Sequence, residues 1–514
     1  MSKTIIIIGA GLAGLSAALQ AAENGCNVKL VSSLPSERAQ SVMAEGGINA
    51  ALNTKDENDS PEEHFTDTIK AACGLADPNA VWGMTQAAPE LVHWLLKLGV
   101  KFNMSGYDDV DLRNFGGQKK KRTAFAQSDT GKQIMTAMID AVRRKEASGM
   151  VERVSHHSFL TLSLCGNICC GCVIRDEYSQ ETVELPGDAV IVATGGMHGL
   201  FGNTTGSLSN TGEVTAELFR LGVPLANGEM IQYHPTTVKC GGKRMLISEA
   251  ARGEGGRLFA MKDGKQWYFM EEKYPELGNL MPRDITAREI WKVSHESEVF
   301  LDMTEISEEI ISNKLSGLAD DCMTYLHKDI RKEPVSVLPG IHYFMGGILV
   351  DEQHRTPIQN LYAAGECCAQ YHGANRLGGN SLLGALYGGR VAAKSACEQA
   401  DVVDLSCATQ IDFPPASQIS EIKQLNKVMQ ETMGVVRNEN MLLNGIKTVQ
   451  ALTGNLPLLG MAVLKSALAR KESRGAHWRE DYPKSNDDDY LKTTVARFDG
   501  KQIQISFVPV PERR

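Results

Sequence analysis

The chain has 514 residues, of which 42% are hydrophobic and 22% charged, and its formal net charge is −9. This composition is that of a globular protein with room for roughly two to four domains. The acidic balance argues against a nucleic-acid partner, because nucleic-acid-binding proteins usually carry a basic face. No apolar run has the length of a membrane span and no secretory leader is evident. We therefore expect a cytoplasmic protein, or one held at a membrane only through a partner.

The predicted elements begin with a strand–helix–strand unit over Lys3–Ile8, Leu12–Asn24 and Val28–Val31. Two further strands are predicted over Asp188–Ala193 and Asn360–Ala364, and each of them ends at glycine. Strands that lie far apart in the sequence and all end at glycine favour a single α/β sheet to which distant segments of the chain contribute. A second domain would then be inserted between these segments.

The tail of the chain is predicted to be helical. Apolar residues recur at helical spacing over Ile419–Met433 and Met441–Thr453. Pro414 and Pro415 precede these helices and are interpreted as a linker.

Gly9, Gly11 and Gly14 form a GxGxxG pattern between the first strand and the first helix. The first glycine allows a tight turn, the second lets a pyrophosphate approach the backbone, and the third lets helix and strand pack closely. The acidic residue expected about 20 positions later is missing, and Ser32 ends the second strand. The missing acidic residue weakens the case for NAD. A hydroxyl can still bond a ribose, so the pattern as a whole still predicts a bound dinucleotide.

A second helix start is predicted at Asn380, after Gly378 and Gly379. Asn380 is a candidate N-cap, and a helix N-terminus at this place would stabilise an anionic reduced cofactor ring. The alternative is a simple glycine turn, and periodicity alone leaves both open.

Two other patterns have plain structural interpretations. Cys169 and Cys172 form a CxxC, but they lie in a strand–turn–strand stretch where cysteine acts as a small hydrophobe, so no metal site is expected. Lys119–Arg122 is a basic run, interpreted as a solvated loop or as a dock for an acidic partner.

Several motifs in order along the chain resemble the flavoprotein subunit of the fumarate reductase and succinate dehydrogenase family, to which L-aspartate oxidases are related. The motifs are Ala44–Ile48, Phe115–Gly117, Arg122–Thr123, Phe125–Ala126, Gln232–Thr236, Ser248–Gly256, Pro282–Asp284, His342–Ile348, His372–Leu377 and Ser473–His477.

The resemblance implies an α/β fold in which a Rossmann-like FAD-binding domain (1–228 and 346–400) is interrupted by an α+β capping domain (229–345). A helical C-terminal domain (401–514) follows.

The resemblance also implies FAD as the cofactor, and one departure suggests how it is held. Members with covalent flavin carry a histidine where this chain has Gln40, which cannot form that bond. FAD is therefore expected to be non-covalent, with a lower potential that favours reducing a substrate. The implied cofactor-binding residues are Gly9, Gly11, Gly14, Ser32, Glu45, Gly46, Gly47, Thr194, Gly195, Glu366, Ser381 and Leu382.

For the chemistry, the resemblance implies hydride transfer from flavin N5 and a proton from Arg283, recharged through Glu249 and Arg252. The spacing of Glu249 and Arg252 places them on one helix face. A plainer interpretation makes Arg283 a helix-start residue after Pro282 at the first helical position. The residues expected to clamp carboxylates are His234, Ser248, His342 and Arg376.

Two departures bear on the substrate pocket. Phe115 and Met345 are expected to line its apolar side, and Phe344 replaces the family's threonine and is expected to add bulk near it. Ser248 replaces another threonine and keeps the hydroxyl.

The expected function is reduction of an activated C=C bond in a small unsaturated carboxylic acid, with fumarate the default. The alternatives are an L-aspartate or succinate oxidase, and a flavin electron-transfer subunit active only with an iron–sulfur partner. The sequence has no iron–sulfur cysteine pattern and no second nucleotide motif. Electrons are therefore expected to come from a partner or a free carrier.

Overall fold

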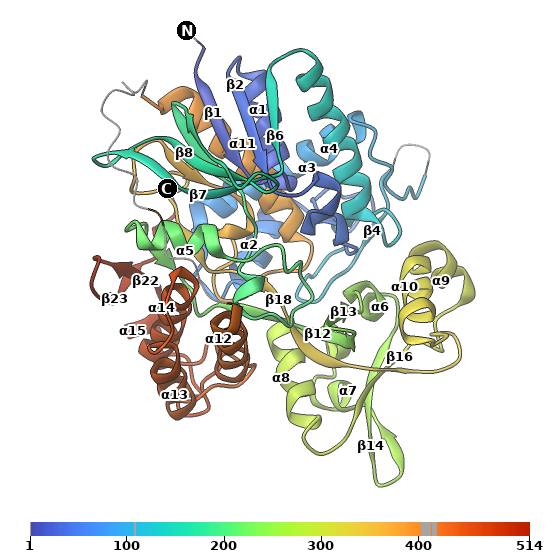
Figure 1. Cartoon of the computed structure of the whole chain (residues 1–514). Coiled ribbons are helices and arrows are strands. Elements are labelled where there is room, and N and C mark those ends of the chain that lie inside the picture. The colour runs from blue at the N-terminus through green and yellow to red at the C-terminus, as the bar shows by residue number, and fades with distance from the viewer. Residues whose placement is uncertain (1, 107–108, 402–412, 414–418) are drawn as a thin grey trace.

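The computed structural model describes residues 2–106, 109–401, 413 and 419–514. Its centre is a parallel sheet in the order β20-β10-β1-β2-β6 (Figure 1). These strands span Leu361–Ala363, Ala189–Val192, Thr4–Ile8, Asn27–Ser32 and Val151–Ser155. The expectation of one sheet built from distant segments is confirmed, although the strand at Val151–Ser155 was not predicted.

The run of isoleucines in β1 is buried on both faces of this sheet. Ile5 and Ile7 pack against a helical layer, and Ile6 and Ile8 pack against a second, three-stranded sheet. The helices are α1 (Leu12–Glu23), α3 (Pro78–Lys97), α4 (Thr130–Ala147) and α11 (Asn380–Gln399), and the strands are β7 (His157–Cys165), β8 (Ile168–Asp176) and β9 (Thr182–Pro186). Cys169 and Cys172 belong to this second core, as buried hydrophobes would.

The segment between residues 231 and 344 forms a separate body beside the central sheet (Figure 1). One sheet, in the order β13-β12-β18, faces the rest of the protein, and another, β15-β14-β16-β17, has its own apolar core. The strands are β12 (Ile231–Cys240), β13 (Lys243–Leu246), β14 (Arg257–Lys262), β15 (Lys265–Trp267), β16 (Val299–Asp302), β17 (Val335–Ser336) and β18 (Leu338–Phe344). The helices are α6 (Glu249–Gly253), α7 (Phe269–Lys273), α8 (Arg283–Val293), α9 (Glu308–Lys314), α10 (Ser316–Asp321) and the π-helical turn Cys322–Leu326.

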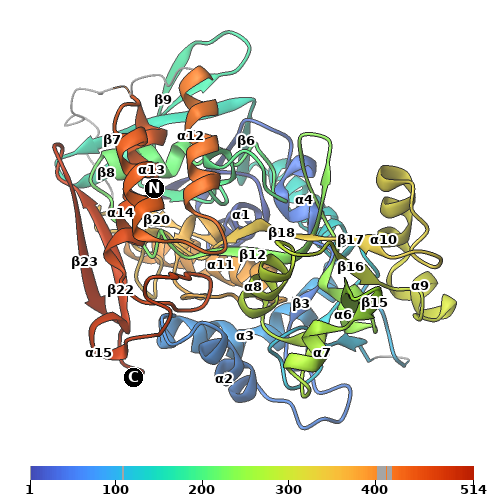
Figure 2. The same ribbon diagram turned by 90° about the horizontal axis from the view of Figure 1, so that it is seen from below.

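The C-terminal region is helical, as predicted, but it also returns to the first domain. Its helices α12 (Ile419–Thr432), α13 (Glu439–Val449), α14 (Asn455–Ala469) and α15 (Asp487–Tyr490) lie on the side opposite α9 and α10 (Figure 2). Strands β22 (Lys492–Phe498) and β23 (Ile503–Pro509) then complete a sheet with β11 (Leu225–Ala226), β19 (Gly347–Leu349) and β21 (Cys368–Ala369). The linker expected at Pro414–Pro415 lies outside the described residues.

The basic run Lys119–Arg122 is only partly the solvated loop that was expected. Arg122 is fully buried, and its guanidinium lies 2.8 Å from Asp59 and 3.0 Å from Asp67. Asp67 comes from α2 (Pro61–Ala71). A buried guanidinium needs counter-charges, so this arginine anchors the loop.

The remaining strands and α-helix are β3 (Ile48–Asn49), β4 (Leu112–Arg113), β5 (Thr123–Ala124) and α5 (Glu213–Arg220).

The described residues contain no helix that is both long enough and apolar enough to span a membrane.

Candidate active site

A cavity of about 860 Å³ runs from the carboxyl ends of β1 and β2 to the segment between residues 231 and 344. At one end it is lined by Gly9, Gly11 and Ser32, and at the other by Arg283 and Arg376. Ligands of open α/β sheets bind at the carboxyl ends of the strands, which is where this cavity begins.

The glycine turn has the shape that a dinucleotide requires. Gly9 has φ +108°, and a Cβ there would lie 2.3 Å from the carbonyl oxygen of Ala193. A Cβ on Gly14 would lie 1.8 Å from the carbonyl oxygen of Gly9, so Gly14 serves helix–strand packing and does not line the cavity. Gly11 has no heavy atom closer than 3.8 Å to such a Cβ and lies open to the cavity. This cradle fits a pyrophosphate at the N-terminus of α1.

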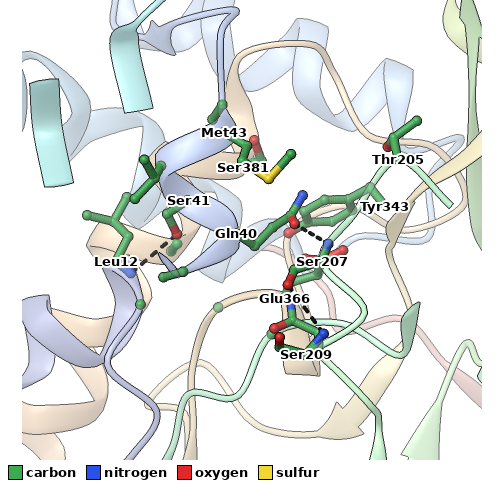
Figure 3. Close-up of a pocket in the computed structure, with 18 of the residues that line it drawn as sticks. Leu12, Gln40, Ser41, Met43, Thr205, Ser207, Ser209, Tyr343, Glu366 and Ser381 are labelled. Atoms are coloured by element: carbon green, nitrogen blue, oxygen red, sulfur yellow. Dashed lines mark hydrogen bonds between the residues drawn. The ribbon is translucent and has the colours of Figure 1, made fainter. Parts of the chain in front are cut away.

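The other residues expected to hold FAD also lie on the wall of the cavity. Its walls include Glu45, Gly46, Gly47, Thr194, Gly195, Glu366, Ser381 and Leu382. Gln40 lies there as well, in a short helical turn, and its side-chain oxygen accepts a hydrogen bond from the backbone N–H of Ser207 (Figure 3). The hydroxyl of Ser41 accepts from the N–H of Leu12 at 3.3 Å, which ties this turn to the start of α1.

Glu45 is an unusual carboxyl group for a cavity wall. Its Oε2 atom is buried without a hydrogen-bond partner in the part of the chain that the structure describes. Burial, and then the nearby Asp321 and Asp129, raise the pKa of Glu45 to about 8. An orphaned polar atom in a cavity fits a site that is completed by a polar ligand.

The start of α11 differs from the sequence prediction. Gly379 is the N-cap, with φ +85°, and Asn380 is the first helical residue. The side chain of Asn380 does not cap the helix. Its Oδ1 atom instead lies 2.7 Å from Nδ2 of Asn49 and 2.9 Å from Nε2 of His64. The left-handed backbone at the cap favours glycine, which explains why asparagine does not occupy it.

Arg283 lies at the far end of the cavity, held by a carboxylate. Its Nε and Nη2 atoms donate to the same oxygen of Glu249 at 2.8 and 2.6 Å, and Nη1 donates to Gln232 at 3.1 Å. Pro282 is the N-cap of α8 and not its first residue, so Arg283 begins the helix one position later than expected.

Glu249 and Arg252 share one face of α6, as their spacing predicted, with 3.3 Å between their charged atoms. Burial opposes ionisation of Glu249, but Arg283 and Arg252 together hold its pKa below the ordinary value. Arg252 does not line the cavity and lies behind Glu249. The three residues therefore form a chain that leads from the cavity into the protein.

His234, His342, Ser248 and Arg376 all line the same end of the cavity. The two imidazole rings are 5.1 Å apart. Burial, followed by nearby charged or ionisable groups that include Arg283, lowers the pKa of both histidines well below the usual range. Burial and Arg283 also lower the pKa of Arg376 to about 9. Neutral histidines beside buried guanidinium groups suit an anionic ligand.

One expectation about the apolar wall was wrong: Met345 does not line the cavity but lies in a small separate core. Phe344 does not line the cavity either, but it lies near it: its N–H donates to the cavity-lining Glu366 at 3.1 Å, and its ring packs against Phe201 and His198. Phe115 does line the cavity, as expected. Phe344 and Met345 lie where β18 ends, and the motif spacing alone does not show which way each side chain faces there.

Sequence reasoning missed three residues of this end of the site. Tyr343 lines the cavity and carries the guanidinium of Arg376 4.3 Å above its ring. Gln232 bonds Arg283, and the hydroxyl of Thr205 lies 2.8 Å from Nδ1 of His342. Tyr343 and Gln232 lie inside the motifs His342–Ile348 and Gln232–Thr236, whereas no motif marks Thr205.

A glycine cradle for a dinucleotide continues here into a buried arginine–carboxylate site, an arrangement that fits an FAD-dependent oxidoreductase. Comparison with known proteins agrees. The protein-family model described as "FAD binding domain" matches residues 4–382, and the family model described as "Fumarate reductase flavoprotein C-term" matches residues 452–513.

The chain is also similar to individual members along its whole length. It is 38% identical to the succinate dehydrogenase flavoprotein subunit of Bacillus subtilis, with 100% of this chain and 98% of that protein covered. It is 31% identical to the L-aspartate oxidase of Streptomyces coelicolor, with 100% and 94% covered. The structure of the FrdA subunit of E. coli quinol fumarate reductase superposes with a TM-score of 0.90 at 27% identity, with 99% and 97% covered. This chain belongs to the fumarate reductase and succinate dehydrogenase flavoprotein family.

Proposed function

We propose that the chain reduces the C=C bond of a small unsaturated dicarboxylate, with fumarate the default substrate. The observation that carries this proposal is Arg283, a buried guanidinium at the cavity wall whose Nε and Nη2 are held by Glu249. Reduced FAD supplies the hydride from its N5 atom when it is bound in the cavity. The cavity residues bind and orient the acid and move the proton.

In this proposal Arg376, His234, His342 and Ser248 bind the carboxylates. The planar fork of arginine can bind a carboxylate through two parallel hydrogen bonds. Arg283 gives a proton to the α carbon, and Glu249 and Arg252 return one to it. The stacking of Arg376 on Tyr343 would fix the plane of its guanidinium before the acid arrives.

The FAD is proposed to be held without a covalent bond, because Gln40 stands where covalent members have a histidine. Its amide oxygen accepts a hydrogen bond from Ser207, and an amide is no nucleophile. Acid precipitation of the protein should leave the yellow cofactor in the supernatant. Flavin that stays with the precipitate would contradict this part of the proposal.

The test of function is anaerobic turnover of fumarate with reduced viologen as the electron donor. Arg283→Ala should abolish turnover while FAD stays bound, and Lys292→Ala, at the exposed last turn of the same helix, should leave it unchanged. Absence of activity on fumarate and on other 2-enoates would refute the proposal.

Oxidation of succinate or L-aspartate is the second candidate, favoured by the names of the similar proteins from B. subtilis and S. coelicolor. An oxygen-electrode assay with each acid separates these activities from fumarate reduction.

An electron-donating partner, such as an iron–sulfur protein, forms the remaining part of the proposal. It is supported by relatives that are named subunits. Co-purification from the native cell tests for this partner. A chain that is active with viologen but purifies alone would point to a free carrier.

A further inference from the structure

Thr205 joins a loop to one histidine of the candidate site. The loop leads from the short helical turn at His198–Leu200 to α5. The hydroxyl oxygen of Thr205 lies 2.8 Å from Nδ1 of His342, and the backbone N–H of Thr205 donates to the carbonyl of Ile341 at 2.9 Å. Both Thr205 and His342 line the cavity, and Figure 3 shows Thr205 among the residues of the cavity wall.

The direction of this hydrogen bond follows from what the hydroxyl can reach. Within the described ranges, the only hydrogen bond of Thr205 Oγ1 is the one to His342. If the hydroxyl accepted from an Nδ1–H group, its own proton would have no acceptor among the described residues, and unpaired donors at a nearly buried position are costly. If it donates, Nδ1 is the acceptor, the hydroxyl proton is paired, and the Nε2–H group is the one left for a ligand in the cavity.

The protonation of His342 completes the argument. Burial, and then His234 and the guanidinium of Arg283, lower the pKa of His342 well below its usual range, so its ring is neutral near pH 7. A neutral imidazole carries one N–H, and the hydrogen bond made by one nitrogen decides which nitrogen holds the proton. With Nδ1 accepting from Thr205, the proton is on Nε2.

We infer that Thr205 is a positioning residue that fixes the Nε2–H tautomer of His342, so that this histidine donates a hydrogen bond to a substrate carboxylate. This inference rests on the proposed function, because it names the group that His342 serves. A histidine with the opposite tautomer would present a lone pair to an anion and would repel it.

The loop also connects other parts of the site. The backbone N–H of Ser207 donates to Gln40, and the carbonyl of Thr204 accepts from the N–H of Arg244 in β13 at 3.3 Å. The hydroxyl of Thr204 lies 3.0 Å from Nδ1 of the buried His198. Thr204 is thus a matched control, since it is a neighbouring buried threonine that bonds a different histidine.

The first experiment measures the tautomer without any substrate. ¹⁵N NMR of histidine-labelled holoenzyme, with the His342 signal identified by its loss in His342→Asn, should show an Nε2–H ring in the wild type. Thr205→Val keeps the size of the side chain, removes the hydroxyl and should abolish this preference, whereas Thr205→Ser and Thr204→Val should retain it. A wild-type ring protonated on Nδ1, or one unchanged in Thr205→Val, would overturn the inference.

The second experiment measures binding of fumarate and succinate through the absorbance of bound FAD. Thr205→Val should weaken binding by about tenfold, the loss expected for one hydrogen bond to a charged group. Thr205→Ser should stay within about twofold of the wild type. In a His342→Asn background, Thr205→Val should have no further effect, because Thr205 acts through His342.

The two experiments separate the two proposals. A wild-type protein that binds neither acid refutes the proposed function, while the NMR result still decides whether Thr205 fixes the tautomer. A wild type that binds both acids, together with a Thr205→Val variant that binds them equally well, refutes the inference about Thr205 and leaves the function standing.

Discussion

Replacing Glu249 by glutamine is the sharpest test of the buried charge network. Glu249 accepts two hydrogen bonds from Arg283, at 2.8 and 2.6 Å, and one from the N–H of Gly116 at 3.1 Å, and it lies 3.3 Å from Arg252. Glutamine keeps the shape but removes the charge, so two buried guanidinium groups lose their counter-ion. Removing one partner of a buried ion pair costs about 3–5 kcal/mol. The proposed proton return would also be lost, which lowers turnover by about 10²- to 10⁴-fold.

The pH dependence of this variant has a definite sign. The folded-state pKa of Glu249 is held below its ordinary value of 4.5 by Arg283 and Arg252 against the opposing effect of burial. The ionised carboxylate therefore stabilises the fold fully above pH 4.5, and this stability is lost as the pH falls through the lower folded-state value. The difference between wild type and Glu249→Gln should thus be large at pH 7 and shrink in acid.

Thermal unfolding of the FAD-bound proteins at several pH values, together with anaerobic fumarate turnover, measures both effects. Glu276→Gln, in an exposed loop, is the control for removing one carboxylate. A Glu249→Gln variant with wild-type stability and turnover at pH 7 would refute both the network and its place in the proton path.

Four other substitutions have defined outcomes. Gly14→Ala should destabilise the fold itself, because the new Cβ would lie 1.8 Å from the carbonyl oxygen of Gly9. Gly11→Ala should fold normally but bind FAD weakly, because Gly11 is where the pyrophosphate approaches the backbone. Melting curves measure the first effect and FAD titration measures the second. In the FAD-free protein the pKa of Glu45 is raised from 4.5 to about 8, so its contribution to stability is present below pH 4.5 and lost as the pH rises to 8. As the pH rises from 4.5 to 8, the unfolding free energy of Glu45→Gln should therefore increase relative to that of the wild type, by up to about 1.4 kcal/mol per pKa unit. Melting temperatures measured across this range check the trend, and a constant difference between the two proteins would contradict it. Arg122→Met should lose about 3–5 kcal/mol of unfolding free energy in denaturant titrations by leaving Asp59 and Asp67 unpaired, and Lys120→Met should lose little.

The sequence predicted the parts of this protein that obey local rules. The glycine turn, the isoleucine strand and the i, i+3 pair of Glu249 and Arg252 follow from short-range geometry, and the structure has all three. The cap of α11 was misplaced by one residue, because only the observed φ of Gly379 shows that the cap is left-handed.

What the sequence could not predict depends on long-range packing. The orientations of Phe344 and Met345 are decided by what packs at the end of β18. Thr205 reaches His342 across 137 positions of the chain. The domain boundaries at residues 228, 345 and 401 stay predictions, as do the roles of the individual site residues.

The sheet that β22 completes has a consequence for how the protein is made. Strands β11 and β19 pair where the chain leaves for the segment 231–344 and where it returns, and β22 joins the free edge of β11. The N–H of Asn227 donates to Thr494 at 2.8 Å, and its side chain accepts from Thr494 at 3.0 Å. A nascent chain therefore cannot pair β22 with β11 until residues near 498 have left the ribosome. Pairings over such distances form slowly, so unfinished chains should be targets for proteases and chaperones.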